Sequence, residues 1–169
     1  MKNRGAKISD HKLRGEWAEM YFMTRAAEHG FQVNKPWGET ASYDFVVGHR
    51  GQFVRVQVKS TICKDGGGYP CVVRRGKRPY FGDPFDYLAA YVILEDVWYI
   101  IPAKLTKGKT SIGLSPNLER SKYAPYKEAW HLLRSRSAAI PATIDRIEAC
   151  AADFLPNIPE AGWAESGQW

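Results

Sequence analysis

The 169-residue sequence predicts one α/β domain built on a central sheet of four or five strands, with a further C-terminal segment appended. Three observations predict this fold: an amphipathic helical stretch near the start, a hairpin of strands after it, and a second hairpin whose first strand is almost wholly apolar. A chain of this size buries about two thirds of its unfolded surface, so it needs neither disulfides nor a structural metal to fold.

The first predicted element is a helix over residues 9–29. Ser9 or Asp10 can cap its start, and Gly30 stands where a helix ends. Apolar side chains recur along it at helical spacing, at Leu13, Trp17, Met20, Tyr21 and Ala27. This stripe predicts the face that packs on the sheet.

Two antiparallel hairpins are predicted after the helix and a short strand over residues 31–35. The first hairpin pairs residues 43–47 with 52–60, around a turn that contains two glycines. The second pairs residues 87–94 with 97–101, and its first strand is apolar throughout, as in a strand buried on both faces.

The segments around these hairpins are shorter and more polar. Residues 71–74 predict an edge strand, which a run of basic residues follows. Residues 104–114 predict a basic loop with a short strand, and residues 126–133 a short helix that turns Trp130 inward.

The strand over residues 52–60 carries the most information about function. Its apolar side chains lie at alternate positions, at Val54, Val56 and Val58. This alternation predicts an apolar face against the helix. The opposite face then carries an amide and an amine, Gln57 and Lys59, side by side.

The chain divides into residues 1–136 and residues 137–169. The second part predicts a helix over residues 137–155, because Pro141 suits a helix start and apolar residues form one stripe, followed by a loose tail. The stripe consists of Ile140, Ile144, Ile147, Ala151 and Phe154. It suits either an interface with another copy or packing against the chain's own sheet.

The net charge of +6 is unevenly distributed. Residues 137–169 hold one base and five acids, which leaves a net charge of +10 on the first 136 residues. A body this basic favours a polyanion, most often nucleic acid, as partner, although many basic proteins bind none. The predicted phosphate contacts are Arg74, Arg75, Lys77, Arg78, Lys107 and Lys109. The alternative for both runs is an ordinary solvated loop.

Several classes of protein do not fit the sequence. No apolar run approaches the roughly 20 residues that span a bilayer, and the N-terminus lacks the apolar region of a secretory signal. Three cysteines without C-x-x-C spacing, and four scattered histidines, disfavour disulfides and zinc. We therefore expect a cytoplasmic protein without a membrane partner.

Four polar residues stand on three elements. Glu19 lies on the helix, Asp44 lies near the start of the second strand, and Gln57 and Lys59 lie on the third strand. A hard cation such as Mg²⁺ prefers oxygen ligands, and an amine beside it can orient or deprotonate a water or meet a phosphate oxygen.

This ordered set resembles the PD-(D/E)xK nuclease superfamily, most closely the group I intron homing endonucleases and their stand-alone bacterial relatives. The resemblance runs from Lys12 to about Leu133 and includes the Gly-x-x-x-Glu of the helix, Tyr-Asp-Phe-Val-Val and Arg-Val-Gln-Val-Lys-Ser-Thr. It also includes Phe-Asp-Tyr at 85–87 and Trp-Tyr-Ile-Ile-Pro at 98–102. The resemblance implies a restriction-endonuclease-like core, a central mixed β-sheet flanked by helices.

The resemblance also implies an activity, that of a Mg²⁺-dependent DNA endonuclease, with Mn²⁺ as a possible substitute. Asp44, Gln57 and Glu19 would be the metal ligands, and Lys59 would complete the catalytic set. Gln57 departs from the family, which usually has Asp or Glu there, although its intron-encoded members tolerate Gln. Spacing from Gly15 selects Glu19 over Glu16. The expected partners are double-stranded DNA and further copies of the chain, in a dimer or tetramer.

Two other functions stay open. Gln57 is compatible with a DNA-binding protein that keeps the nuclease fold without cutting, and the distant resemblance to Holliday junction resolvases allows branched DNA as the substrate. Each residue also has a plain structural interpretation: Asp44 as a turn acid, Glu19 as a surface acid, and Gln57 and Lys59 as a solvated strand face.

Overall fold

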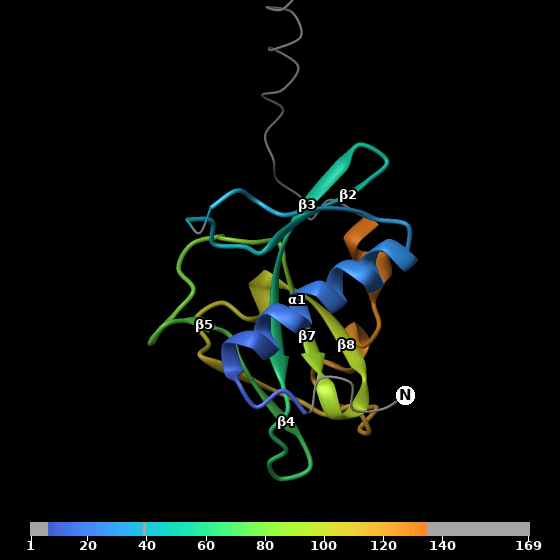
Figure 1. Ribbon diagram of the computed structural model, residues 1–169. Coiled ribbons are helices and arrows are strands. Elements are labelled where there is room, and N and C mark those ends of the chain that lie inside the picture. The colour runs from blue at the N-terminus through green and yellow to red at the C-terminus, as the bar shows by residue number, and fades with distance from the viewer. Residues whose placement is uncertain (1–6, 39, 135–169) are drawn as a thin grey trace, which may run out of the picture. The chain divides into compact units, whose positions relative to one another are not determined.

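A computed structural model describes residues 7–38 and 40–134. Its core is one α-helix and a five-stranded sheet in the order β1-β2-β3-β7-β8 (Figure 1). The elements are α1 (His11–Glu28), β1 (Gln32–Asn34), β2 (Phe45–His49), β3 (Gln52–Thr61), β7 (Tyr87–Val92) and β8 (Val97–Pro102). Because β3 and β7 pair in parallel and all other neighbours pair antiparallel, the sheet is mixed, and the predicted fold class is confirmed.

Smaller elements surround this sheet. Two further pairs of strands are antiparallel: β4 (Tyr69–Val72) with β9 (Ser111–Leu114), and β5 (Arg74–Arg75) with β6 (Arg78–Pro79). The 3-10 helices are η1 (Ile93–Glu95), η2 (Ala103–Leu105), η3 (Ala124–Tyr126) and η4 (Trp130–Arg134). Within the described ranges, no helix has both the length and the apolar character needed to cross a bilayer.

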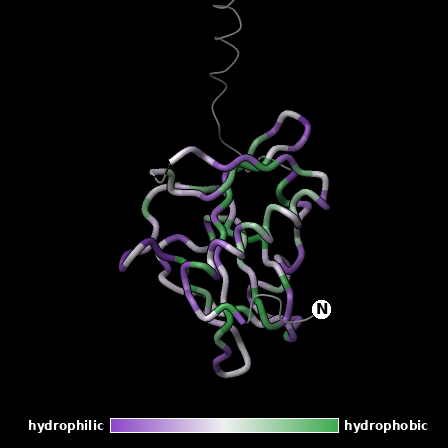
Figure 2. Tube along the Cα trace, viewed as in Figure 1, coloured by the Kyte–Doolittle hydropathy of each residue, from purple (hydrophilic) through white to green (hydrophobic). Residues whose placement is uncertain are grey.

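The central sheet is buried on both faces. One face packs against α1 and η4 through a cluster that includes Phe22, Val56 and Trp130. The other packs against the small β4–β9 sheet through a second cluster that includes Leu88 and Leu114. Figure 2 shows hydrophobic residues along the central strands and hydrophilic residues along the outer loops. Burial on both faces explains why β7 is apolar at every position.

The predicted packing face of the helix was partly wrong. Ala18, Phe22 and Ala26 are the buried residues of α1, whereas Leu13 and Met20 are 53% and 54% exposed. Met20 is two positions from both Ala18 and Phe22, a rotation of about 200° around the helix axis. The two alanines of the buried stripe let α1 lie close to the sheet. The prediction followed the larger apolar residues of the helix and therefore missed this face.

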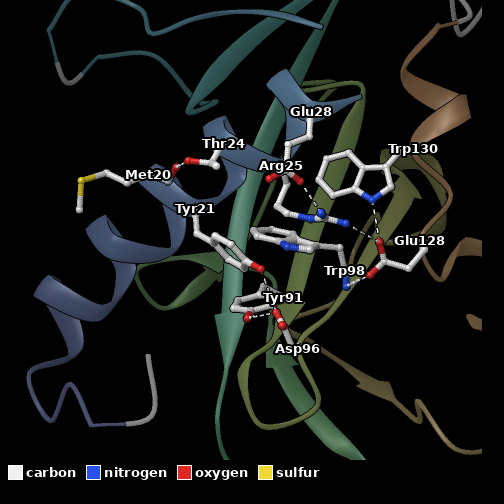
Figure 3. A network of polar contacts seen from close by, with 10 residues as sticks. All are labelled: Met20, Tyr21, Thr24, Arg25, Glu28, Tyr91, Asp96, Trp98, Glu128 and Trp130. Carbon is white, nitrogen blue, oxygen red and sulfur yellow. Dashed lines mark hydrogen bonds and ion pairs between the residues drawn. The ribbon is translucent and has the colours of Figure 1, made fainter. Parts of the chain in front are cut away.

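A polar and aromatic network fixes the rotation of α1 against β7 and β8 (Figure 3). The Asp96 carboxylate accepts hydrogen bonds from the hydroxyls of Tyr21, at 3.1 Å, and Tyr91, at 2.6 Å. Tyr21 stacks on Trp17 with 5.5 Å between ring centres. Since Glu19 lies between these two aromatic residues on the helix, the network also sets the direction in which Glu19 leaves it.

The predicted strands are close to those observed. The first hairpin turns at Arg50 and Gly51, whose positive φ angles of 49° and 76° are those of a two-residue turn between twisted strands. Residues 71–74 were predicted as one edge strand, but β4 ends at Val72 and Arg74 begins the β5–β6 hairpin.

The predicted helix over residues 126–133 was wrong. Two 3-10 helices stand there, separated by Glu128, whose φ is 49°. The Glu128 N–H donates to the Trp98 carbonyl, at 2.8 Å, so this segment pairs with the edge of β8 in place of continuing as a helix. Trp130 does point inward and is 3% exposed. The predicted C-terminal helix over residues 137–155, its stripe and the tail lie outside the described residues.

Candidate active site

Strand pairing places Asp44 opposite Gln57. Asp44 immediately precedes β2, and its N–H donates to the Val56 carbonyl of β3, at 2.9 Å. One of its carboxylate oxygens accepts two hydrogen bonds, from the Val58 N–H at 2.7 Å and from the Gln57 amide nitrogen at 2.5 Å. Gln57 is 5% exposed. The pair is thus a built feature of the β2–β3 hairpin, and the interpretation of Gln57 as a solvated strand residue is wrong.

The surroundings of Asp44 disfavour its charged form. Burial is the main cause that raises the pKa of this carboxyl group, and repulsion from Glu19 raises it further. The Val58 N–H, the charge of Lys59 and the Gln57 amide act in the opposite direction but do not restore the ordinary value. A carboxylate in this state gains from an added positive charge.

Glu19 reaches the same region from α1. Its carboxylate forms an ion pair with the Lys35 ammonium, at 3.0 Å, and the Glu19 side chain is 25% exposed. The hydrogen bond to Glu19 is the main cause that raises the pKa of Lys35, and Asp44 and Glu16 contribute through their charges. Lys35 therefore faces both acids of the site, whereas Glu16 is exposed on the helix.

Lys59 lies on β3 two residues beyond Gln57, on the same face of the strand. It is half-buried, and its charge acts on Asp44, Tyr80 and Cys71. Burial raises the pKa of the Tyr80 hydroxyl, and a hydrogen bond with Lys59 opposes that rise. Burial raises the pKa of the Cys71 thiol to about 12, which excludes this thiol as a nucleophile near neutral pH.

Two members of this site were not predicted from the sequence. Lys35 stands after a three-residue strand, and no motif marks it as a partner of Glu19. Tyr80 follows the basic run, and only the fold brings it to Lys59, on another strand. The residues around Lys35 and Tyr80 form no motif that would indicate a role. Each reaches the site only because the chain folds back and brings a distant segment next to it.

Four of the predicted DNA-binding residues form an exposed hairpin. Arg74, Arg75, Lys77 and Arg78 all lie on β5, β6 or the turn between them, at the left of Figure 1. The Arg75 guanidinium donates to the hydroxyl of Ser42, at 3.2 Å, two residues before Asp44. The hairpin is therefore joined directly to the segment that carries the acid of the site.

The two remaining predicted DNA-binding residues, Lys107 and Lys109, differ in how strongly their ammonium groups are held by neighbours. Lys107 is exposed and lies 3.5 Å from the Asp83 carboxylate, which is more exposed still. Lys109 donates to the Tyr123 hydroxyl, at 3.1 Å, and this bond is the main cause that raises its pKa. Lys107 is thus free to meet a phosphate, whereas the ammonium group of Lys109 is already engaged.

The side chains that could hold a metal here all carry oxygen atoms, although the Gln57 amide turns its nitrogen toward Asp44. Asp44 and Glu19 provide carboxylates, and Gln57 provides an amide. Across the described residues, no three His, Cys, Asp or Glu side chains converge as a metal cluster. Two carboxylates with one amide oxygen suit a hard cation that keeps several waters, and do not suit zinc.

The chain is similar to known proteins in sequence and in fold. Residues 9–133 match the PD-(D/E)XK endonuclease family. The solved structure of a bacterial homing endonuclease, I-Ssp6803I, is similar, with 32% sequence identity and a TM-score of 0.65 over 75% of this chain and 93% of that one. No protein with a curated description matches the chain. The family match spans the helix, both hairpins and all four predicted site residues, and the chain belongs to the PD-(D/E)XK endonuclease family.

Proposed function

We propose that this nuclease is a Mg²⁺-dependent DNA endonuclease that hydrolyses phosphodiester bonds, and that it acts in the manner of a homing endonuclease. The observation that supports this most strongly is the buried Asp44 carboxylate, held by Gln57 and the Val58 N–H, with Lys59 beside it. The similar solved structure is that of a homing endonuclease, which favours the same substrate class.

Asp44, Glu19 and Gln57 are the proposed metal ligands. When bound, a divalent cation supplies positive charge for the negative charge that develops on phosphate oxygens, and it makes water a better nucleophile. Asp44 fits this role because its charged form is disfavoured in the protein alone. Gln57 fits it because an amide presents an oxygen and a nitrogen at nearly the same positions. The Gln57 nitrogen donates to Asp44 without a cation, and reversal of the amide would turn the oxygen toward one.

Lys59 is the proposed group that acts on the water or on the phosphate. Its charge acts on Asp44, and its hydrogen bond with Tyr80 supports a position of the ammonium near the acid. Lys35 neutralises Glu19 in the free protein. Because Lys35 is 63% exposed, it can leave Glu19 when a cation or a phosphate enters, at little cost.

The basic β5–β6 hairpin and Lys107 are proposed to hold the DNA backbone. Their cations are exposed, and the hairpin is joined to the Asp44 segment through the Arg75–Ser42 hydrogen bond. Phosphate contacts position a protein on DNA without reading its sequence. These residues therefore account for affinity and orientation, and the target is set elsewhere.

A nicking assay tests the proposed activity. Supercoiled plasmid and a branched junction are incubated with the protein in EDTA, in Mg²⁺ and in Mn²⁺. Metal-dependent nicking or linearisation of the plasmid is the expected result. Binding without cutting in either metal would support the non-cleaving alternative, and preference for the junction would support a resolvase-like nuclease.

Double-strand cutting would require two sites, since one site of this kind cuts one strand. We propose that the active species is at least a dimer, with a tetramer as the other possibility. Light scattering at high protein concentration measures this. A monomer that still makes double-strand cuts would contradict the proposal.

A further inference from the structure

Two aromatic side chains are almost completely exposed. Trp37 and Phe81 are each 99% exposed, whereas the other large hydrophobic residues at the described surface reach at most 57%. Single exposed apolar residues are common on proteins, but side chains of this size usually keep part of their surface covered. Full exposure of two large rings therefore calls for a specific explanation.

The backbone holds both rings outward by the same means. Trp37 stands between Pro36 and Gly38, and Phe81 is followed by Gly82. Gly38 and Gly82 have φ angles of 77° and 71°, and a Cβ added at either would meet nothing within 4 Å. Each glycine is thus required by its backbone conformation and not by space. A glycine with a positive φ angle directly follows each aromatic residue, and both rings stand clear of the core.

Both loops lie beside the candidate active site. Trp37 comes two residues after Lys35, the partner of Glu19, and Phe81 directly follows Tyr80, which meets Lys59. In Figure 1 the connection from β1 to β2 and the chain after β6 run along the same side of the sheet as the β5–β6 hairpin. The Arg75–Ser42 hydrogen bond joins the hairpin to the first of these connections.

The surface around Phe81 combines an aromatic wall with positive charge. An open hollow of about 630 Å³ is lined by Phe81, Tyr80 and the proline and glycines beside them, together with Arg78 and Lys107. The exposed ion pair between Lys107 and Asp83, at 3.5 Å, holds Lys107 only weakly. A flat ring with cations next to it matches a nucleotide, whose base offers a π-face and whose phosphate offers charge.

We infer that Trp37 and Phe81 stack on DNA bases next to the phosphate that is cut. This inference rests on the proposed function, because it takes DNA as the partner. The rings enter the duplex where a base step is opened, and the exposed cations of the hairpin hold the backbone on either side. Stacking is tolerant of sequence, but opening a step costs least at pyrimidine–purine steps. The nuclease therefore favours cutting next to TA or CA steps.

Anisotropy of a labelled random-sequence duplex in EDTA measures this stacking without cleavage. Trp37→Ala and Phe81→Ala should each weaken binding about five- to 100-fold, the usual effect of removing one stacked ring. The slope of log affinity against log salt should not change, because no phosphate contact is lost. Trp37→Phe and Phe81→Tyr should keep most of the affinity. Trp37→Leu and Phe81→Leu should not, since leucine is apolar but has no π-face.

Phe53→Ala is the matched control. Phe53 is an aromatic residue 49% exposed near the start of β3, at the end of the strand away from Lys59. Its loss should leave DNA affinity unchanged. Thermal denaturation of every variant shows whether the fold is intact. An intact fold is expected, because the rings of Trp37 and Phe81 pack against no other described part of the protein.

The outcomes separate this inference from the proposed function. Wild-type protein that neither binds nor cuts DNA in any metal would overturn both. Wild-type binding and cutting, with equal affinity for both alanine variants, would overturn the stacking inference alone. Full affinity of the leucine variants would also overturn it, since apolar contact would then suffice. Permanganate reactivity of thymines beside the mapped nick should rise with wild-type protein and fall with Trp37→Ala.

Discussion

Replacement of Gln57 by Glu should make the stability of the protein depend on a divalent cation. The Gln57 amide donates to the Asp44 carboxylate at 2.5 Å, so Gln57→Glu sets two carboxylates against each other. At about 3 Å and an effective dielectric constant of about 20, their repulsion is about 5 kcal/mol. Uptake of one proton relieves part of it, and the lost hydrogen bond costs about 1.5–3 kcal/mol by itself.

We therefore expect Gln57→Glu to lower the free energy of unfolding in EDTA by about 2–5 kcal/mol at pH 8. For a domain of this size, about 4 °C in melting temperature corresponds to 1 kcal/mol, so the melting temperature should fall by about 8–20 °C. Mg²⁺ should reverse part of the loss, because a third carboxylate strengthens the site. Tenfold tighter cation binding returns about 1.4 kcal/mol at high cation concentration.

The pH dependence of this variant has a definite sign. The pKa of Asp44 is already raised by burial and by Glu19, and a second buried acid raises the pKa of the pair further. Because the pKa is raised in the folded state, the loss in free energy of unfolding is absent below about pH 4, where the carboxyl groups of the unfolded chain are protonated. The loss grows as the pH rises through the pKa of the folded state. Thermal denaturation in EDTA at pH 5 and pH 8 should show the larger deficit at pH 8.

Gln32→Glu is the control for this experiment. Gln32 lies on the exposed edge of the same sheet, so the same chemical change should leave stability and its Mg²⁺ dependence nearly unchanged. A Gln57→Glu protein that melts within a degree of wild type in EDTA, with the same response to Mg²⁺, would refute the pairing of Gln57 with Asp44 in a metal site. Cleavage by this variant and not by wild type would instead identify a retired nuclease.

Three further predictions concern Asp44, Lys59 and the basic residues. Asp44→Asn should reduce nicking at least about a hundredfold. It should not lower the melting temperature, because the charged form of Asp44 is disfavoured in the folded protein. A variant that still cuts would contradict the assignment of Asp44 as a metal ligand. Lys59→Ala should slow nicking at least about a hundredfold. Lys59→Arg should not restore the rate, since a guanidinium is larger and cannot act as a base. Near-wild-type turnover by Lys59→Ala would place Lys59 outside the mechanism. In salt titrations of DNA binding, Arg74→Ala should reduce the slope of log affinity against log salt by about 0.9, whereas Lys109→Ala should change it little, because its ammonium is engaged by Tyr123.

The sequence predicted the sheet and the convergence of the site better than it predicted the helices. Alternation of valines in β3 identifies its buried face without knowledge of the partner, and the order of Asp44 and Gln57 in one hairpin places them opposite each other. Both are local properties of paired strands. The exposure of Met20 depends on how closely the alanines of α1 approach the sheet, which no local pattern encodes.

The parts of the site that sequence reasoning missed depend on contacts between distant segments. Lys35 meets Glu19 because β1 runs back along α1, and Tyr80 meets Lys59 because the chain after β6 returns to β3. The helix predicted around Glu128 was wrong for the same reason, since a backbone hydrogen bond to β8 replaced the helical hydrogen bonds. In each case a long-range contact, and not residue type, decided the outcome.

The parallel pairing of β3 with β7 has a consequence for how such a nuclease can change its contacts with DNA. Parallel neighbours cannot be joined by a tight turn, so the chain must leave the sheet after Thr61 and return only at Tyr87. That excursion carries the β5–β6 hairpin, Tyr80 and the Phe81 loop, while Asp44, Gln57 and Lys59 stay on the hairpin that forms the sheet. Residues 74–84, the part of the excursion after β4, hold only the β5–β6 hairpin and the loop that follows it, so insertions or exchanges there leave the register of the central sheet untouched. The contacts with DNA can thus be altered without disturbing the chemistry, which makes residues 74–84 the natural segment to exchange between relatives that differ in DNA affinity or in the base steps they favour.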